Sequence, residues 1–152
     1  MSTVRKALLS DLAAVREIFR TASLGNPGDR DALLAHPEVL VFEDTAIVEG
    51  RTRVAVDDDG EVVGFATPRP LGERVWELDD LFVAPRHMRR GFATKLIEDL
   101  VGGATEQGVD HIQVTANPHA MQFYRSVGFV DEGVAETQFG PAPLLRLNIP
   151  RF

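Results

Sequence analysis

The chain has 152 residues, a formal net charge of −7 and no cysteine. Its length predicts one domain, residues 1–152, that buries roughly two-thirds of its unfolded surface without a disulfide or a metal. The lack of cysteine excludes disulfides, thiolate metal sites and a cysteine-bound acyl intermediate. The acidity disfavours nonspecific nucleic-acid binding and favours cationic substrates.

Two features of the chain bear on its location. Charged residues interrupt the first fifteen residues too early for a signal peptide, and no apolar run approaches the ~18 residues of a membrane span. We therefore expect a soluble cytoplasmic protein with no membrane partner.

The N-terminal third predicts a strand followed by two helices. Residues 3–7 form the strand, and Ser10 or Asp11 caps the first helix, which ends near Ser23. The apolar face of this helix is expected to hold Leu12, Val15, Phe19 and Ala22. Turn residues at 24–29 lead to a second short helix, opened by Asp29 or Asp31. Residues 36–50 show no clean period and could form a lid.

The middle of the chain predicts a sheet. Residues 52–57 and 61–67 read as a hairpin that turns at 58–60, and residues 74–83 extend it as an antiparallel sheet. Residues 111–115 follow a helix, so they are expected to pair in parallel with 74–83.

The C-terminal part predicts a helix and a hairpin. Asn117 caps the helix and Pro118 starts it. Strands at 130–139 and 144–149 then form a hairpin through a turn at 140–143. The result is an α+β fold: a mixed, mostly antiparallel sheet of six to seven strands with helices on both faces.

A basic loop lies between the strand that ends at Val83 and a helix that Gly102 and Gly103 are expected to stop. A helix N-terminus has unsatisfied N–H groups and about half a positive charge, so it attracts phosphates. Gly91 keeps side chains out of the way. The loop also holds three arginines: Arg86, Arg89 and Arg90. The spacing is typical of an anion cradle, although solvated arginines at an ordinary turn would look the same.

Residues 83–93, VAPRHMRRGFA, resemble the acetyl-CoA pyrophosphate loop of the GNAT superfamily of N-acetyltransferases, V-x-P followed by Q/R-x-x-G-x-G/A. Met88 departs from the pattern, because Gln or Arg is usual there. Residues 117–129 independently resemble the same superfamily's N-x-x-A-x-x-x-Y-x-x-x-G-F segment at every fixed position. The likeness covers nearly the whole chain and implies a central pair of parallel strands that splay apart to admit the cofactor.

The resemblance implies an enzyme that transfers acetyl from acetyl-CoA directly to a primary amine of a small molecule or peptide. It implies that Tyr124 protonates or stabilises the departing thiolate. A backbone N–H near Phe82 or Val83 is expected to stabilise the oxyanion. The residues expected to bind acetyl-CoA are Leu81, Phe82, Val83, Met88, Arg89, Arg90, Gly91, Phe92, Ala93, Thr94, Asn117 and Phe123.

A carboxylate is expected to deprotonate the amine, because an amine with a pKa of about 10.4 costs about 4.6 kcal/mol to deprotonate at pH 7. Glu77 is the preferred base, with its pKa raised by repulsion from Asp79 and Asp80. Either aspartate could instead orient a cationic substrate. Acids on a half-buried strand are also commonly just solvated.

The sequence leaves some alternative functions open and excludes others. The chain could bind acyl-CoA without catalysis, as a sensor or interaction module. A nucleotide-phosphate domain is excluded by the absence of GxGxxG and GKS/GKT sequences. No pair of histidines has metal-ligand spacing, so no metal is expected. Homodimers built through terminal strands are common in the superfamily, which leaves the oligomeric state open.

Overall fold

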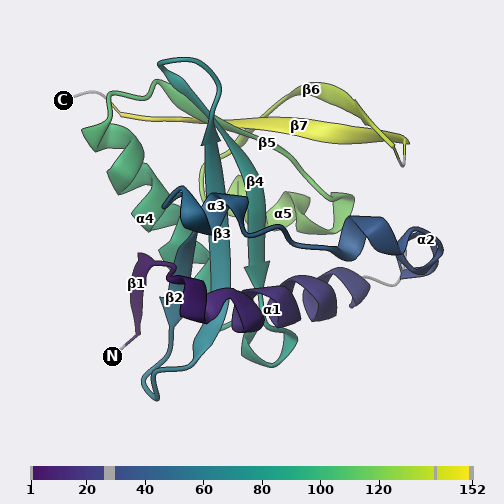
Figure 1. The fold of residues 1–152 in the computed structure, drawn as a ribbon. Coiled ribbons are helices and arrows are strands. Elements are labelled where there is room, and N and C mark those ends of the chain that lie inside the picture. The colour runs from purple at the N-terminus through teal and green to yellow at the C-terminus, as the bar shows by residue number, and fades with distance from the viewer. Residues whose placement is uncertain (1, 26–29, 139, 151–152) are drawn as a thin grey trace. The chain divides into compact units, whose positions relative to one another are not determined.

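The computed structural model describes residues 2–25, 30–138 and 140–150. The strands are β1 Thr3–Lys6, β2 Arg53–Val56, β3 Val62–Pro70, β4 Val75–Val83, β5 His111–Thr115, β6 Val130–Thr137 and β7 Gly140–Asn148 (Figure 1). The α-helices are α1 Leu12–Leu24, α2 Arg30–Ala35, α3 Thr45–Val48, α4 Phe92–Glu106 and α5 Met121–Ser126. Short 3-10 helices are η1 Leu9–Asp11, η2 Pro37–Leu40, η3 Pro85–His87 and η4 Pro118–Ala120.

The strands form one seven-stranded mixed sheet in the order β1-β2-β3-β4-β5-β7-β6. The β1–β2, β2–β3, β5–β7 and β6–β7 pairs are antiparallel. β4 and β5 are parallel, and their register pairs Val75 with His111, Trp76 with Ile112 and Glu77 with Gln113. The mixed sheet, the β2–β3 hairpin and the parallel pair confirm the fold class predicted from the sequence.

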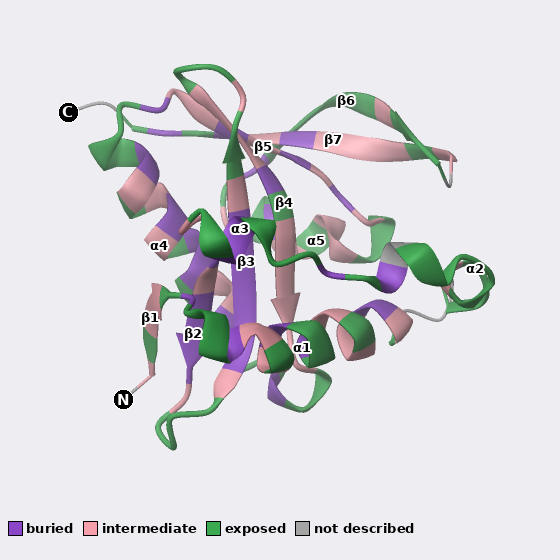
Figure 2. Cartoon of the chain, viewed as in Figure 1, coloured by how far each residue is buried: buried purple, intermediate pink, exposed green. Residues whose placement is uncertain are grey.

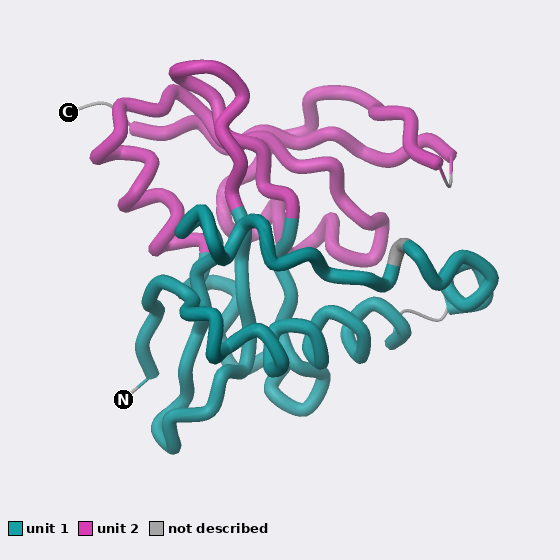
Figure 3. Tube along the Cα trace, viewed as in Figure 1, with its two compact units in different colours: residues 1–67, 80–96 teal, residues 68–79, 97–152 magenta. Residues whose placement is uncertain are grey.

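The chain divides into two compact units (Figure 3). Unit 1 contains residues 1–67 and 80–96, and unit 2 contains residues 68–79 and 97–152. No helix in the described part of the chain is long and apolar enough to cross a membrane.

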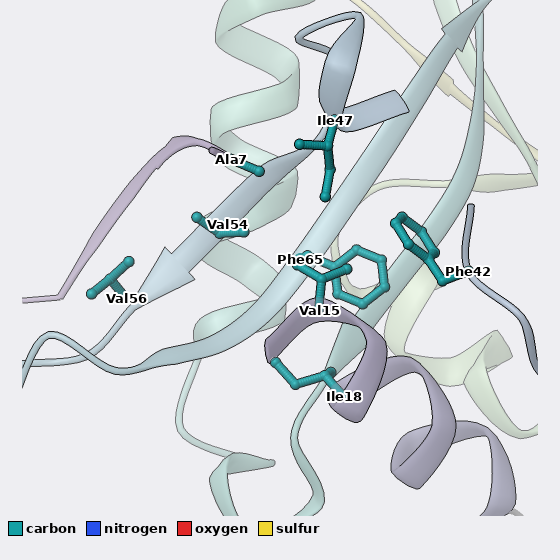
Figure 4. Packing of buried hydrophobic residues seen from close by; sticks show 8 residues of the cluster. All are labelled: Ala7, Val15, Ile18, Phe42, Ile47, Val54, Val56 and Phe65. Atoms are coloured by element: carbon teal, nitrogen blue, oxygen red, sulfur yellow. The ribbon is translucent and has the colours of Figure 1, made fainter. Parts of the chain in front are cut away.

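The core of unit 1 lies between α1 and strands β2 and β3 (Figure 4). Val15 and Ile18 lie one helical turn apart on the buried face of α1, where 0% and 4% of their surface is exposed. Phe65 is fully buried, and its ring meets Phe42 in a T-shaped contact at 5.2 Å. The predicted face omitted Ile18, while Leu12 and Phe19 lie at the edge of the cluster.

The stretch 36–50, for which the sequence predicts a possible lid, has regular structure. It contains η2 and α3, and it contributes Leu40, Phe42, Ala46 and Ile47 to the buried set. Its apolar residues are spread over two short helices and a connecting loop, so the sequence shows no single period. The predicted helix opener Asp29 lies outside the described residues, and α2 begins at Arg30.

Strand β3 is buried from Val63 to Thr67 (Figure 2). Side chains alternate between the two faces of a strand. Phe65 therefore faces the core, while Gly64 faces the opposite side. A Cβ at Gly64 would lie 2.9 Å from the Phe82 carbonyl oxygen, 3.3 Å from Val83 and 3.4 Å from Leu96 at the start of α4. Glycine is required here because two strands and a helix meet too closely for a side chain.

The prediction that Gly102 and Gly103 stop helix α4 is wrong, because the helix continues to Glu106. The packing of its later turns outweighs the helix cost of two glycines. Ala104 is fully buried, and a Cβ at Gly103 would lie 3.6 Å from the Trp76 ring. The turn that follows Glu106 contains Gly108, which has φ +72°. The Gly108 N–H donates to Thr105 O at 3.2 Å, and the Val109 N–H donates to Ala104 O at 2.9 Å.

The terminal hairpin forms as predicted, but residues 140–143 are not its turn. They begin β7, and Pro141 and Pro143 lie opposite Glu136 and Val134 of β6. The β5 register starts only at Leu144, so the prolines occupy the part of β7 that pairs with one neighbouring strand. A proline lacks an N–H but is tolerated where one side of a strand makes no ladder bond.

Candidate active site

The loop between β4 and α4, in unit 1, has the backbone shape expected of an anion cradle. Arg89 and Gly91 have left-handed φ values of +65° and +86°. Helix α4 begins at Phe92, and the N–H of Lys95 bonds to the Gly91 carbonyl at 3.0 Å. The backbone amides of the first turn of α4 come before the run of i to i−4 hydrogen bonds. In other proteins, amides in this position at a helix N-terminus bind anions.

The surroundings of this loop fit a diphosphate. A Cβ built on Gly91 would meet no atom within 4 Å in the part of the chain that the structure describes. Met88 is 59% exposed, and Arg89 and Arg90 are exposed. Two cationic side chains and the start of a helix thus border open space. Arg86 instead pairs with Glu61 at the β2–β3 turn, so the third predicted arginine is directed to another element.

The remaining predicted cofactor residues of unit 1 are more buried. Phe92 is 8% exposed, and the Phe82 ring packs edge-on against Phe19 at 5.2 Å. These two rings stabilise unit 1, so their contribution to a ligand would come from the backbone. The residues in the same group that are half-buried are Leu81, Val83, Ala93 and Thr94.

Glu77 lies on β4 in unit 2, half-buried, next to Gln113 of β5. Burial is the largest cause that raises its pKa; the hydrogen bond from Gln113 partly offsets this, Asp79 adds to it and Arg69 opposes it. The predicted direction of the pKa shift is therefore correct. The predicted cause was only a minor contributor, because desolvation outweighs repulsion from Asp79.

Asp79 is held by Arg69. The guanidinium donates from Nε to Oδ2 at 2.9 Å and from Nη2 to Oδ1 at 3.4 Å. A cationic substrate would have to compete with this two-pronged ion pair, which weakens Asp79 as a substrate ligand. Sequence reasoning missed Arg69; the signal was its position on the strand that neighbours β4. Asp80 lies in unit 1 and is half-buried.

Tyr124 lies on α5 in unit 2 and is 6% exposed. Its ring contacts Phe129 at 5.2 Å and Phe123 at 5.6 Å. The helix is preceded by η4, which Asn117 caps by accepting a hydrogen bond from the His119 N–H at 2.9 Å. The predicted cap is therefore confirmed, and the tyrosine has the aromatic surroundings of a fixed side chain.

Comparison with known proteins agrees with this arrangement. Residues 12–129 match the sequence model of the acetyltransferase (GNAT) family. The chain is 34% identical over 88 residues to streptothricin acetyltransferase of Streptomyces lavendulae. This match covers 53% of this chain and 45% of that protein. It is 30% identical over 125 residues to the chloroplastic serotonin N-acetyltransferase 2 of Oryza sativa subsp. japonica, covering 78% and 56% of the two chains.

The fold also matches solved structures. PaiA N-acetyltransferase of Thermoplasma acidophilum, solved in complex with coenzyme A, superposes with a TM-score of 0.76 and 16% identity, covering 97% of this chain and 99% of that one. The chain spans about half the length of the curated relatives it matches. Because the family match covers most of the chain, including the basic loop and the Asn117–Tyr124 segment, this protein belongs to the acetyltransferase (GNAT) family.

Proposed function

We propose that this protein is an acetyl-CoA-dependent N-acetyltransferase that acts on a primary amine of a small molecule or peptide. The observation that carries the proposal is the loop before α4, where Gly91 leaves open space beside a helix N-terminus and two exposed arginines. This arrangement is suited to the pyrophosphate of coenzyme A. Membership of the acetyltransferase family supports the same assignment.

In this proposal the loop binds chiefly through its backbone. The amides of the first turn of α4 bind phosphate oxygens, and Arg89 and Arg90 add positive charge. Thr94, in the same turn, adds a hydroxyl. The departure at Met88 removes one side-chain donor but leaves every backbone donor in place. Acetyl-CoA supplies an activated acetyl group as a thioester, and the chain's own residues handle the protons.

Glu77 is the proposed base. The amine nitrogen forms a bond to the carbonyl carbon, and the amine proton passes to the Glu77 carboxylate directly or through a water. Burial raises the Glu77 pKa, which makes this carboxylate a stronger base than a solvated glutamate. Gln113 orients the carboxylate through its hydrogen bond.

Tyr124 is the proposed acid for the leaving group. When the carbon–sulfur bond breaks, the phenol donates a hydrogen bond to the departing thiolate, which becomes the thiol by taking a proton from the phenol or from water. A thiol has a pKa near 8.5 and a tyrosine near 10, so a strong hydrogen bond is favoured over full transfer. The rings of Phe123 and Phe129 hold the tyrosine side chain in one orientation.

The acceptor is proposed to be a cation. The chain has a formal net charge of −7, which attracts protonated amines. The names of the two curated relatives, a streptothricin acetyltransferase and a serotonin N-acetyltransferase, point to small amines as acceptors.

The test is release of free thiol from acetyl-CoA across a panel of amines, including polyamines, amino acids, aminoglycosides, arylalkylamines and peptides. The protein contains no cysteine, so a thiol-reactive dye reports only coenzyme A. We expect amine-dependent release that falls at least about tenfold in Tyr124→Phe. Coenzyme A binding without turnover on any amine, and indifference to Tyr124→Phe, would favour a non-catalytic sensor.

A further inference from the structure

His87 is a buried histidine whose ring nitrogens have no hydrogen-bond partner among the described residues. The residue is 9% exposed and lies at the end of η3, with its ring edge-on to Phe92 at 6.0 Å. Neither Nδ1 nor Nε2 makes a hydrogen bond to any residue within the described ranges. An imidazole that is buried without a partner loses free energy, so a ligand that satisfies it would be stabilising.

Two carboxylates from another part of unit 1 lie beside this imidazole. Asp57, at the end of β2, and Glu61, before β3, each offer an oxygen, and these oxygens and a His87 ring nitrogen all lie within 4.8 Å of one another. Asp57 Oδ1 accepts the amides of Asp59 and Glu61 at 3.0 and 2.9 Å. Glu61 Oε1 accepts from Arg86. Each carboxylate therefore retains a second oxygen for a ligand.

The imidazole and Asp57 line a hollow of about 290 Å³. Asp58, Asp59, Arg90 and Phe92 complete most of its wall. Three aspartates and one arginine line it, so the lining itself favours a positive charge. The buried imidazole that lines this hollow and the two fixed carboxylates are different observations from those that carry the coenzyme A proposal, although Arg90 and Phe92 border both places.

We propose that Asp57, Glu61 and His87 bind a divalent transition metal of the Zn²⁺ type. One imidazole and two carboxylates are ligands that Zn²⁺ accepts at about 2.0–2.2 Å. The ligand atoms of a tetrahedral site at that range lie about 3.3–3.6 Å apart, so the three side-chain atoms, which now lie within 4.8 Å of one another, would move closer on binding. Mg²⁺, which prefers oxygen ligands and keeps its waters, suits the site poorly.

The metal would link the β2–β3 turn to the residue directly before Met88. This tether would hold the beginning of the basic loop in place. A search of the sequence for pairs of histidines could not find this site. It contains one histidine and two acids, and the acids lie at least 26 positions away from the histidine in the chain.

The test is calorimetric titration of ZnCl₂ into the full chain after dialysis against a chelator. We expect one Zn²⁺ per chain, and we expect Co²⁺ to give visible absorption bands typical of nitrogen and oxygen ligation. His87→Gln should weaken Zn²⁺ binding about 100-fold, and Glu61→Gln, which is exposed and cannot disturb the core, about tenfold or more. The matched control is His36→Gln, which removes an exposed histidine that pairs with Glu38.

These titrations use no coenzyme A, so they succeed or fail independently of the proposed acetyl transfer. No heat with ZnCl₂ would overturn the site. Zn²⁺ binding that survives both His87→Gln and Glu61→Gln would also overturn it, as would binding lost in His36→Gln. Mg²⁺ binding as tight as Zn²⁺ binding would indicate an ordinary acidic surface and reject the proposal.

Discussion

Glu77 of β4 and Gln113 of β5 form the last pair in the parallel register, and the Gln113 amide donates a hydrogen bond to the Glu77 carboxylate. Two opposing effects therefore act on one group: burial raises the Glu77 pKa, and the amide lowers it by stabilising the charged form. Burial is the larger effect. The parallel pair thus sets both the position and the basicity of the proposed base.

Glu77→Gln should reduce kcat about 10²- to 10⁴-fold, because the amide cannot take up a proton. The loss should be greatest for an amine with a pKa of about 10.4 and smallest for an amine with a pKa near 7.7, which is partly neutral at pH 7. Steady-state rates on one acceptor of each kind check this. An equal, small loss on both acceptors would show that Glu77 is a structural residue.

Gln113→Leu should raise the pKa of Glu77 further, because it removes the donor that stabilises the carboxylate. The acid limb of the kcat/KM profile should then move to higher pH, with the plateau less affected. The control is Gln107→Leu, which changes an exposed glutamine just after α4. An unmoved acid limb in Gln113→Leu would mean that another group titrates in the profile.

The hydrogen bond between Glu77 and Gln113 marks the boundary of what the sequence predicts. Local patterns identified the strands, the Asn117 cap and the basic loop, because each depends on residues close together in the chain. Partners from distant segments were not predicted: Gln113 beside Glu77, Arg69 on Asp79, and Asp57 with Glu61 near His87. These contacts depend on strand register, and no local propensity specifies it.

The incorrect helix stop at Gly102 and Gly103 and the incorrect turn at 140–143 have the same origin. The sequence shows that Gly102 and Gly103 are poor helix formers, but it does not show Trp76 packing on that turn. The sequence likewise indicates a turn at residues 140–143. In the structure these residues are the part of β7 whose strand register is with β6 and not with β5. Tertiary packing decides both cases.

Asp11→Asn should destabilise the fold by about 1–3 kcal/mol at pH 7. Asp11 accepts from Arg5 at 2.7 and 3.1 Å and from the Leu8 amide at 2.8 Å, and the Arg5 bond is the main cause that lowers its pKa. Because the Asp11 pKa is lower in the folded than in the unfolded protein, the ionised carboxylate stabilises the fold at pH values above the unfolded pKa of about 3.9. This stabilisation is lost as the pH falls through the folded pKa.

The difference in Tm between wild type and Asp11→Asn should therefore shrink below about pH 4. The control is Asp131→Asn, which breaks the exposed pair with Arg125 and should leave Tm nearly unchanged. A Tm difference that stays constant from pH 7 to pH 3 would contradict the assignment.

Gly64→Ala should destabilise the protein by about 1–3 kcal/mol, because the new Cβ would lie 2.9 Å from the Phe82 carbonyl oxygen. Gly102→Ala is the opposite case: it lies in the middle of α4, and its Cβ would meet nothing within 4 Å among the described residues. That substitution should stabilise the helix by roughly 0.5–1 kcal/mol. Urea unfolding of both variants checks the signs, and a neutral Gly64→Ala would show that β3 and β4 can separate at no cost.

The central claim is that the loop before α4 binds the diphosphate of coenzyme A, and calorimetric titration of coenzyme A tests it most directly. Gly91→Ala puts a methyl group into the open space of the loop, whereas Gly72→Ala carries a similar left-handed φ, +78°, in the β3–β4 turn of unit 2. We predict one coenzyme A per chain, binding weakened about tenfold or more in Gly91→Ala, and no change in Gly72→Ala. The absence of binding heat in the wild type, or equal affinity in Gly91→Ala, would contradict the account.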